Sequence, residues 1–184
     1  LLKNPFKAKT YLGVDIGTAS VKIVEIADTK GKPTIRNYGI LETQGHLERL
    51  NDVIQTSSLK ISDKETAGLL RALIKEIRPK SNIVAASLPA FTAFTALFEV
   101  PAMSEKETAQ AMQYQAKTLV PLPLTEVAID WLPVGEYQEP DGTRKRRIFL
   151  VSIPNDQIRK YQEIFKAAGL VLSVLEIETL SLAR

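Results

Sequence analysis

Hydrophobic and polar positions alternate along the first forty residues, and this pattern predicts strands. The expected strands are Tyr11–Asp15, Val21–Ala27 and Thr34–Leu41. Lys30-Gly-Lys-Pro33 supplies a turn between the second and the third, so an antiparallel meander is the simplest arrangement. Residues 42–61 are polar and irregular, with room for one further short strand near Leu59–Ile61.

The period of the pattern then changes from two to about 3.6, which predicts a helix. Ser62 and Glu65 have the spacing of a capping box. The apolar positions that follow form one stripe, at Leu70, Leu73, Ile74 and Ile77. Pro79 ends the helix, and the apolar run Asn82–Ser87 suits a buried strand.

A second set of elements is expected after Pro89. Its strands are Thr92–Val100, Val127–Val134, Arg147–Ile153 and Leu170–Ile177. Ser104 and Glu107 repeat the capping box and open a helix whose inner face is Ala109, Met112, Ala116 and Leu119. A third helix is capped by Asn155, ends at Gly169, and turns Ile158, Tyr161, Phe165 and Ala168 inward.

This order predicts two compact units in an α/β (α+β) chain. Residues 89–176 have the βαββαβ order of ferredoxin-like domains. Residues 1–88 form the other unit, and at Glu178–Arg184 the chain begins a further helix. Because a helix of less than two turns is marginal by itself, we expect the chain to be part of a longer protein.

The stretch Tyr11–Ile26 carries the most informative chemistry. A strand ends in Asp15, a turn follows at Gly17-Thr-Ala-Ser20, and a second strand begins with Lys22 nearby. Backbone N–H groups of such a turn can bind phosphate oxygens, the lysine adds positive charge, and the carboxylate can hold magnesium directly or through water. An ordinary β-hairpin, whose Asp and Gly serve only the turn, fits the same spacing.

Composition excludes several other functions. The chain has no cysteine and one histidine, which rules out disulfides, thiol catalysis and a multi-histidine metal site. A net charge of +3 is too small to indicate nucleic-acid binding. The basic run Arg144-Lys-Arg-Arg147 follows an Asp-Gly turn and is either a solvated hairpin tip or a contact for an acidic lipid or partner. The most apolar window, Ile83–Val100, is too polar to span a bilayer, and the N-terminus has no secretory h-region.

Four stretches together resemble the PilM family of type IV pilus assembly proteins. Asp15-Ile-Gly-Thr-Ala-Ser-Val-Lys22 is similar to the first phosphate loop of the superfamily of actin, heat-shock chaperones and sugar kinases. The other three are Leu97–Glu105, Leu119–Trp131 and Leu175–Arg184, in the order that the family has them.

The resemblance implies an actin-like, ribonuclease H-like ATPase lobe. Residues 1–88 and 177–184 correspond to subdomain 1A, residues 89–176 to an inserted subdomain 1C, and the second lobe is expected to be missing from this stretch. ATP and Mg²⁺ are the implied cofactors. The implied site residues are Asp15 for magnesium through water, Gly17, Thr18, Ala19 and Lys22 for the phosphates, and Glu178 for the attacking water or the metal. A helix N-terminal acid, favoured by the helix dipole, is the other interpretation of Glu178.

The resemblance also implies a function and partners. It predicts a cytoplasmic ATP-binding scaffold, at most a weak ATPase in the full-length chain and no enzyme in this stretch. Such a scaffold binds the N-terminal cytoplasmic tail of PilN and couples the inner-membrane complex to the pilus motor ATPases, without inserting into the membrane. The predicted peptide groove lies between 1A and 1C, with Phe91, Phe94, Phe98, Val100 and Met103 as its apolar residues, although each of these also suits a core position.

Two functions of other classes stay open at this point. A sugar-kinase-type phosphotransferase would require a substrate acid or base and a second phosphate loop. A membrane organiser like FtsA would require an amphipathic C-terminal helix.

Overall fold

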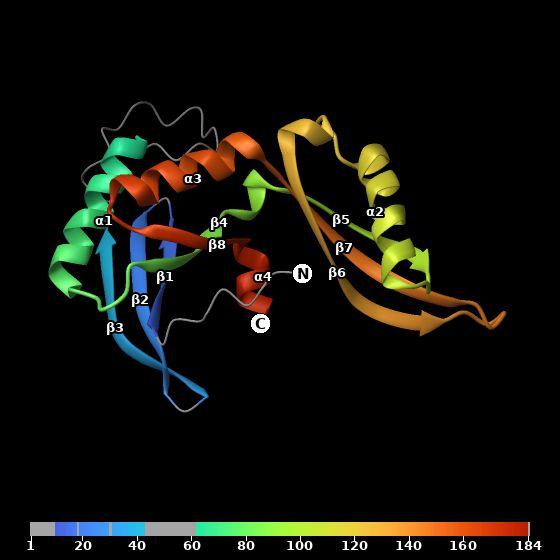
Figure 1. Ribbon diagram of the computed structural model, residues 1–184, viewed down its shortest axis with the longest axis horizontal. Helices are drawn as coiled ribbons and strands as arrows, with labels where there is room; N and C mark the ends of the chain where they lie inside the picture. The colour runs from blue at the N-terminus through green and yellow to red at the C-terminus, as the bar shows by residue number, and fades with distance from the viewer. Residues whose placement is uncertain (1–9, 18, 30, 43–61, 184) are drawn as a thin grey trace. The chain divides into compact units, whose positions relative to one another are not determined.

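The computed structural model describes residues 10–17, 19–29, 31–42 and 62–183. Residue contacts divide the chain into two units (Figure 1): unit 1 comprises residues 1–90 and 159–184, and unit 2 comprises Phe91–Ile158. The expected strand near Leu59–Ile61 and the residue Thr18 lie outside the described residues.

Unit 1 is built on a five-stranded mixed sheet in the order β3-β2-β1-β4-β8. Its strands are β1 (Thr10–Ile16), β2 (Ser20–Thr29), β3 (Lys32–Glu42), β4 (Ile83–Leu88) and β8 (Val171–Ile177). The predicted meander is confirmed, because β1 pairs antiparallel with β2 and β2 with β3. Strands β4 and β8 extend the sheet in parallel with β1.

Two helices cover one face of this sheet, α1 (Asp63–Ile77) and α3 (Asn155–Ala167). They are joined by an ion pair of 3.1 Å between Lys160 Nζ and Asp63 Oδ1, and Arg71 donates to the Ala167 carbonyl at 3.2 Å. The predicted capping box is present: Ser62 Oγ accepts from the Glu65 N–H, and the Glu65 carboxylate accepts from the Ser62 N–H. Among the described residues, the core of this unit includes Leu12, Val14, Val21, Ile23, Leu70, Leu73, Val84, Leu88, Tyr161, Ile164 and Phe165.

Unit 2 has a three-stranded antiparallel sheet in the order β5-β7-β6. Its elements are β5 (Phe94–Pro101), α2 (Glu105–Leu119), η2 (Leu124–Glu126), β6 (Val127–Gln138) and β7 (Arg144–Pro154). The short helix η1 (Ala90–Thr92) begins at the last residue of the first segment of unit 1 and continues into unit 2. Helix α2 has the predicted capping box of Ser104 and Glu107. Its Met112 and Ala116 pack against buried side chains of the sheet, among them Ile148 and Leu150.

The predicted βαββαβ order of residues 89–176 is present as β5, α2, β6, β7, α3 and β8, but these six elements do not form one ferredoxin-like unit. Strand β8, expected as the last strand of the insert, pairs with β4 in unit 1, and Ile83 faces Val171 in that register. Most of α3 also belongs to unit 1, so unit 2 has only the order βαββ. The apolar pattern of β8 specifies a buried strand but carries no information about which strand it pairs with.

Helix α4 (Glu178–Ala183) follows β8 directly, as the pattern predicts. Ser181 on α4 donates to Glu176 Oε2 at 3.3 Å. Among the described residues, no helix is long and apolar enough to cross a membrane.

Candidate functional site

The parallel strands of unit 1 bring three polar residues to one edge of the sheet. Strands β1, β4 and β8 run in the same direction, so their carboxyl ends lie at the same edge. Asp15 and Ser87 are the second-to-last residues of β1 and β4, and Glu178 follows β8 directly. Open sheets of this kind bind ligands outside the carboxyl ends of their strands.

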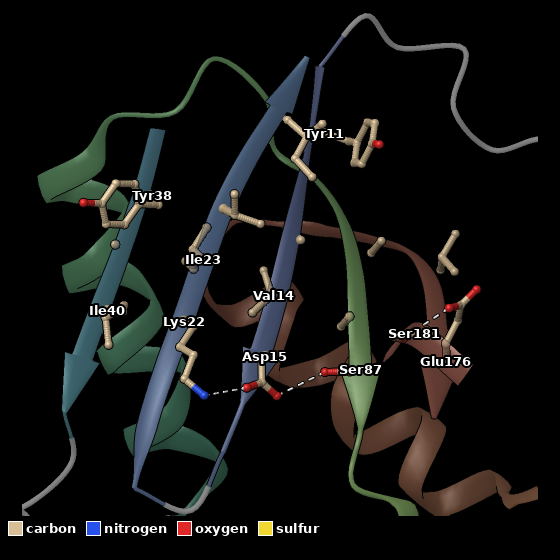
Figure 2. A pocket seen from close by; sticks show the side chains of 17 residues that line it. Tyr11, Val14, Asp15, Lys22, Ile23, Tyr38, Ile40, Ser87, Glu176 and Ser181 are labelled. Atoms are coloured by element: carbon tan, nitrogen blue, oxygen red, sulfur yellow. Dashed lines mark hydrogen bonds and ion pairs between the residues drawn. The ribbon is translucent and has the colours of Figure 1, made fainter. Parts of the chain in front are cut away.

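Lys22, Asp15 and Ser87 form one row across three neighbouring strands (Figure 2). The register places Asp15 opposite both Lys22 of β2 and Ser87 of β4. Lys22 Nζ donates to Asp15 Oδ2 at 3.0 Å, and Ser87 Oγ donates to Asp15 Oδ1 at 3.1 Å. The side chains of Lys22 and Asp15 are 51% and 42% exposed, so the pair is open to a ligand.

The turn between β1 and β2 is tight. The Gly17 N–H donates to the Ser20 carbonyl at 3.0 Å, and a Cβ on Gly17 would lie 3.1 Å from that oxygen. A side chain at position 17 would therefore require the turn to shift. In this conformation the Gly17 N–H is used by the turn, so Gly17 serves the site by allowing the chain to bend tightly there. Ala19 is exposed in the same turn.

A groove of about 600 Å³ crosses the sheet face on which this row lies. Asp15, Lys22 and Ser87 line it, together with Glu176 and Ser181. Its other side is apolar, where Tyr38 and Ile40 of β3 expose 69% and 60% of their surface (Figure 2). Polar groups on one side and apolar side chains on the other are typical of small-molecule sites.

Glu178 has a defined contact of its own. Its Oε1 accepts a hydrogen bond of 2.9 Å from the Ala90 N–H. This bond joins the start of α4 to the chain two residues after the end of β4. Glu178 is not among the residues that line the groove. Its charge nevertheless reaches Tyr161 of α3: burial, followed by the negative charges of Asp15 and Glu178, raises the pKa of Tyr161 to about 12.

The five residues predicted for the peptide groove have different environments in unit 2. Val100 is buried, and Phe94, Phe98 and Met103 pack against the core clusters of this unit. Phe91 is 58% exposed. Phe91 is therefore the residue of this set that presents most of its side chain to solvent.

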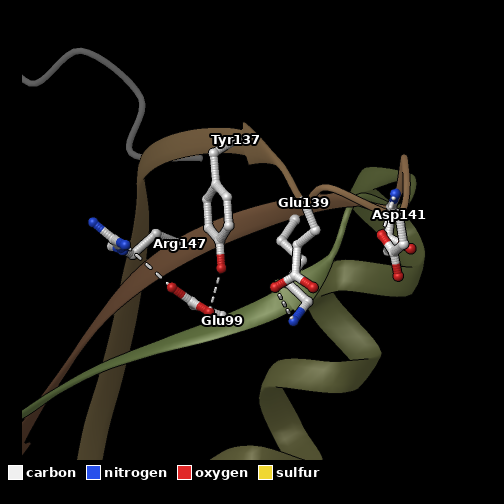
Figure 3. Close-up of polar contacts among 7 residues, drawn as sticks. Glu99, Tyr137, Glu139, Asp141 and Arg147 are labelled. Atoms are coloured by element: carbon white, nitrogen blue, oxygen red, sulfur yellow. Dashed lines mark hydrogen bonds and ion pairs between the residues drawn. The ribbon is translucent and has the colours of Figure 1, made fainter.

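The basic run lies in strand β7, where the prediction placed a hairpin tip. Lys145, Arg146 and Arg147 form ion pairs with Glu139, Glu136 and Glu99. Around Glu99, the hydroxyl of Tyr137 donates to the carboxylate, and the Arg147 guanidinium lies 5.6 Å from the Tyr137 ring centroid (Figure 3). The Tyr137 and Arg147 hydrogen bonds lower the pKa of Glu99, and the same carboxylate raises the pKa of Tyr137. Because three of the basic side chains already pair with glutamates of unit 2, the structure favours a solvated hairpin over a contact with an acidic lipid or partner.

Sequence patterns did not reveal Ser87 as a partner of Asp15. Ser87 ends a run of small residues, Val84-Ala-Ala-Ser87, which is typical of a buried strand. Only the parallel pairing of β1 with β4 brings its hydroxyl to the carboxylate.

The sheet order, the acid and lysine at its carboxyl edge, and the insert between β4 and α3 define a lobe of the actin-like fold. The family model described as type IV pilus assembly protein PilM matches residues 13–184, so the chain belongs to the PilM family.

Two solved structures show the same fold. A chain of a PilM–PilN type IV pilus biogenesis complex aligns with a TM-score of 0.74 at 21% identity, over 95% of this chain and 49% of that one. The cytoplasmic domain of EpsL, an inner-membrane component of the type II secretion system of Vibrio cholerae, aligns with a TM-score of 0.57 at 12% identity, over 94% of this chain and 58% of that one. The chain therefore spans about half the length of these relatives.

Proposed function

We propose that the chain provides the first phosphate-binding lobe of an ATP-binding scaffold in type IV pilus assembly. Unit 1 corresponds in this proposal to subdomain 1A and unit 2 to subdomain 1C. The observation that carries the proposal is the row Lys22–Asp15–Ser87 at the carboxyl edge of an actin-like sheet.

The side chains present fit magnesium and phosphate. Mg²⁺ is usually held by one or two carboxylates, with water and phosphate oxygens completing its shell. Asp15 supplies one such carboxylate, and the described part of the chain contains no group of three or more metal-ligating side chains. The bound cation would neutralise phosphate charge, and Asp15 would hold it through water.

The chain's own residues have separate roles at this edge. The Ser87 hydroxyl fixes the orientation of the Asp15 carboxylate. The Lys22–Asp15 pair is half-exposed and therefore worth at most about 1 kcal/mol, so the ammonium can exchange its carboxylate partner for a phosphate. Glu178 remains a candidate for positioning water, and the scaffold would be at most a weak ATPase.

We propose PilN as the partner, through its N-terminal cytoplasmic tail. The support is the family and the fold shared with the chain in the PilM–PilN complex. Such binding would place the protein in the cytoplasm at the inner membrane and link the membrane complex to the motor ATPases. Phe91 offers exposed apolar surface for this peptide.

Calorimetry of Mg²⁺–ATP with the full-length protein tests the nucleotide site. Lys22→Ala should weaken binding by about 10- to 100-fold, because it removes a charge-assisted contact worth about 1.5–3 kcal/mol. Lys117→Ala, at an exposed position of α2 in unit 2, is the matched control. Equal affinities for wild type and Lys22→Ala, with both proteins folded, would exclude this site.

Fluorescence anisotropy with a labelled PilN-type peptide tests the partner. Phe91→Ala should weaken peptide binding about tenfold or more, as expected for a central aromatic contact. Tyr114→Ala removes another aromatic side chain of unit 2, one that is 72% exposed on α2, and should leave affinity unchanged. If both substitutions have the same effect, Phe91 has no specific part in peptide binding.

A further inference from the structure

Unit 1 has helices on one face of its sheet, while the other face presents apolar side chains to solvent. Leu12 and Val21 alternate with the groove residues along β1 and β2, so they point toward the helices, and they are 0% and 1% exposed. On the groove face, Ile35 is 67% exposed, and Tyr38 and Ile40 are exposed to a similar extent (Figure 2). A contiguous apolar patch of this kind usually marks a surface that binds another segment or molecule.

The strand register makes this patch continuous across all five strands. One row, in the order β3-β2-β1-β4-β8, consists of Tyr38, Val24, Gly13, Ala85 and Val174, all of which line the groove. A second row lies behind it and consists of Ile35, Ile26 and Tyr11. These two rows together form the apolar face. The row Lys22–Asp15–Ser87 lies nearer the carboxyl edge, so the apolar face is distinct from the polar site.

The middle of the apolar face is low. Gly13 has no side chain and Ala85 has a single methyl group, while Val24 and Val174 stand on the strands beside them. Neighbouring strands lie about 4.8 Å apart, and a helix with its side chains is about 10–12 Å wide. A helix that lies over β1 and β4 can therefore contact Val24 on one side and Val174 on the other.

The strand directions favour a helix as the occupant of this face. Strands β1, β4 and β8 are parallel, and sheets of parallel strands usually bury both faces under helices. Among the described residues, α1 and α3 cover one face, and Ser181 of α4 is the one helical residue that lines the groove. The described part of unit 1 therefore lacks the second helical layer that is usual for this type of sheet.

The lengths of the relatives favour a helix of the same protein over a separate partner. The parts that match this chain make up 49% of the chain in the PilM–PilN complex and 58% of the EpsL domain. About half of each relative thus lies outside the match. A covering segment in the same chain has a high effective concentration, so it does not require the affinity of a free partner.

We propose that in the full-length protein an amphipathic helix from outside residues 1–184 lies on the apolar face. It follows β1 and β4, and its apolar side contacts Val24, Ala85 and Val174. It leaves the row Lys22–Asp15–Ser87 open at the carboxyl edge of the sheet. This inference does not depend on nucleotide binding, because it concerns the apolar rows alone.

Thiol labelling of the full-length protein tests whether the face is covered. Residues 1–184 contain no cysteine, so Tyr38→Cys and Ile35→Cys each add one thiol to this part, and the unsubstituted protein gives the baseline. Tyr114→Cys, at a position that is 72% exposed on α2, is the control. After division by each variant's rate in urea, labelling at positions 35 and 38 should be about tenfold or more slower than at position 114. Equal rates at all three positions, in variants with native circular dichroism, would overturn the proposal. Two test positions are used in case one variant fails to fold.

Dilution and a crystal structure identify what covers the face. Protection by the same chain is unchanged when the protein is diluted, whereas protection lost on dilution would mean that a second copy covers the face and would overturn the proposal. In a crystal structure of the full-length protein, we expect apolar side chains of one helix within about 4.5 Å of Val24 and Ala85. A face left open, or covered by residues 1–184 themselves, would also overturn it.

Discussion

Gly39 gives the sharpest test of how α1 packs on the sheet. It lies in β3, and a Cβ built on it would lie 2.7 Å from Leu73 Cδ1 and 2.8 Å from Ile77 Cγ2. Carbon atoms prefer separations of about 3.5–4.0 Å, so Gly39→Ala requires a displacement of roughly 0.7 Å or more. Leu73 is 5% exposed and has little room to move.

We expect Gly39→Ala to lower the free energy of unfolding by about 1–3 kcal/mol, the usual cost of overpacking. For a chain of this size, 1 kcal/mol corresponds to about 2–4 °C in Tm. Urea and thermal unfolding, followed by far-ultraviolet circular dichroism, measure both quantities.

Gly68→Ala is the matched control. Gly68 lies inside α1, and a Cβ there would meet nothing within 4 Å. Alanine should therefore raise stability by about 0.5–1 kcal/mol, because glycine is a poor helix former. Replacing glycine by alanine should therefore lower the free energy of unfolding at position 39 and raise it at position 68, both in unit 1.

A double-mutant cycle locates the clash. Leu73→Ala removes the nearer of the two opposing carbons, so Gly39→Ala should cost less in that background than in the wild type. If Gly39→Ala proves as stable as wild type, or costs the same in both backgrounds, α1 does not contact β3 as described.

Three further predictions concern other parts of the chain. Ser62→Ala and Ser104→Ala should each lower unfolding free energy by about 1 kcal/mol through the loss of a helix cap, and Ser→Asn at either position should restore most of it in the same urea assay. Glu25 is 3% exposed and accepts from the Lys80 N–H at 2.7 Å, so Glu25→Ala should cost at least about 1–3 kcal/mol, whereas Glu25→Gln, which retains an acceptor, should cost less. Residues 1–184 alone should bind Mg²⁺–ATP weakly or not at all in calorimetry, because we expect the second phosphate loop and the adenosine pocket to belong to a second lobe; micromolar affinity would contradict that expectation.

The pH dependence of the two caps has a defined sign. Hydrogen bonds from Ser62 and Ser104 lower the pKa of Glu65 and of Glu107. A lowered folded-state pKa stabilises the folded protein above the ordinary pKa of glutamate, and this stabilisation is lost as pH falls through the folded value. Both carboxylates should therefore titrate below the ordinary range in carbon-detected magnetic resonance, and a midpoint above it would contradict the capping geometry.

Features set by neighbouring residues could be predicted from the sequence. Both capping boxes depend on side chains three positions apart, and both were predicted correctly. The β1–β2 hairpin that carries Asp15 and Lys22 is equally local, and its register confirms that the two residues face each other. The family, and with it the fold, followed from four motifs in the right order.

Features that depend on distant pairing could not be predicted in the same way. The apolar pattern of β8 is compatible with either sheet, and its place beside β4 depends on contacts between residues about ninety positions apart. The partnership of Ser87 with Asp15 has the same origin, since it requires the β1–β4 pairing. Tyr161 was predicted correctly as an inward residue, because the helical period of apolar positions is a local pattern.

The insertion of unit 2 between β4 and α3 also has a consequence for synthesis on the ribosome. Ile83 pairs with Val171, so 88 residues must be translated after Ile83 before its partner exists. At about 5–20 residues per second, that delay is roughly 4–18 s, during which the outer side of β4 lacks its neighbour. Over the same interval every strand of unit 2 emerges, since β5, β6 and β7 all precede residue 155. The later domain in the chain can thus be complete before the earlier one closes its sheet.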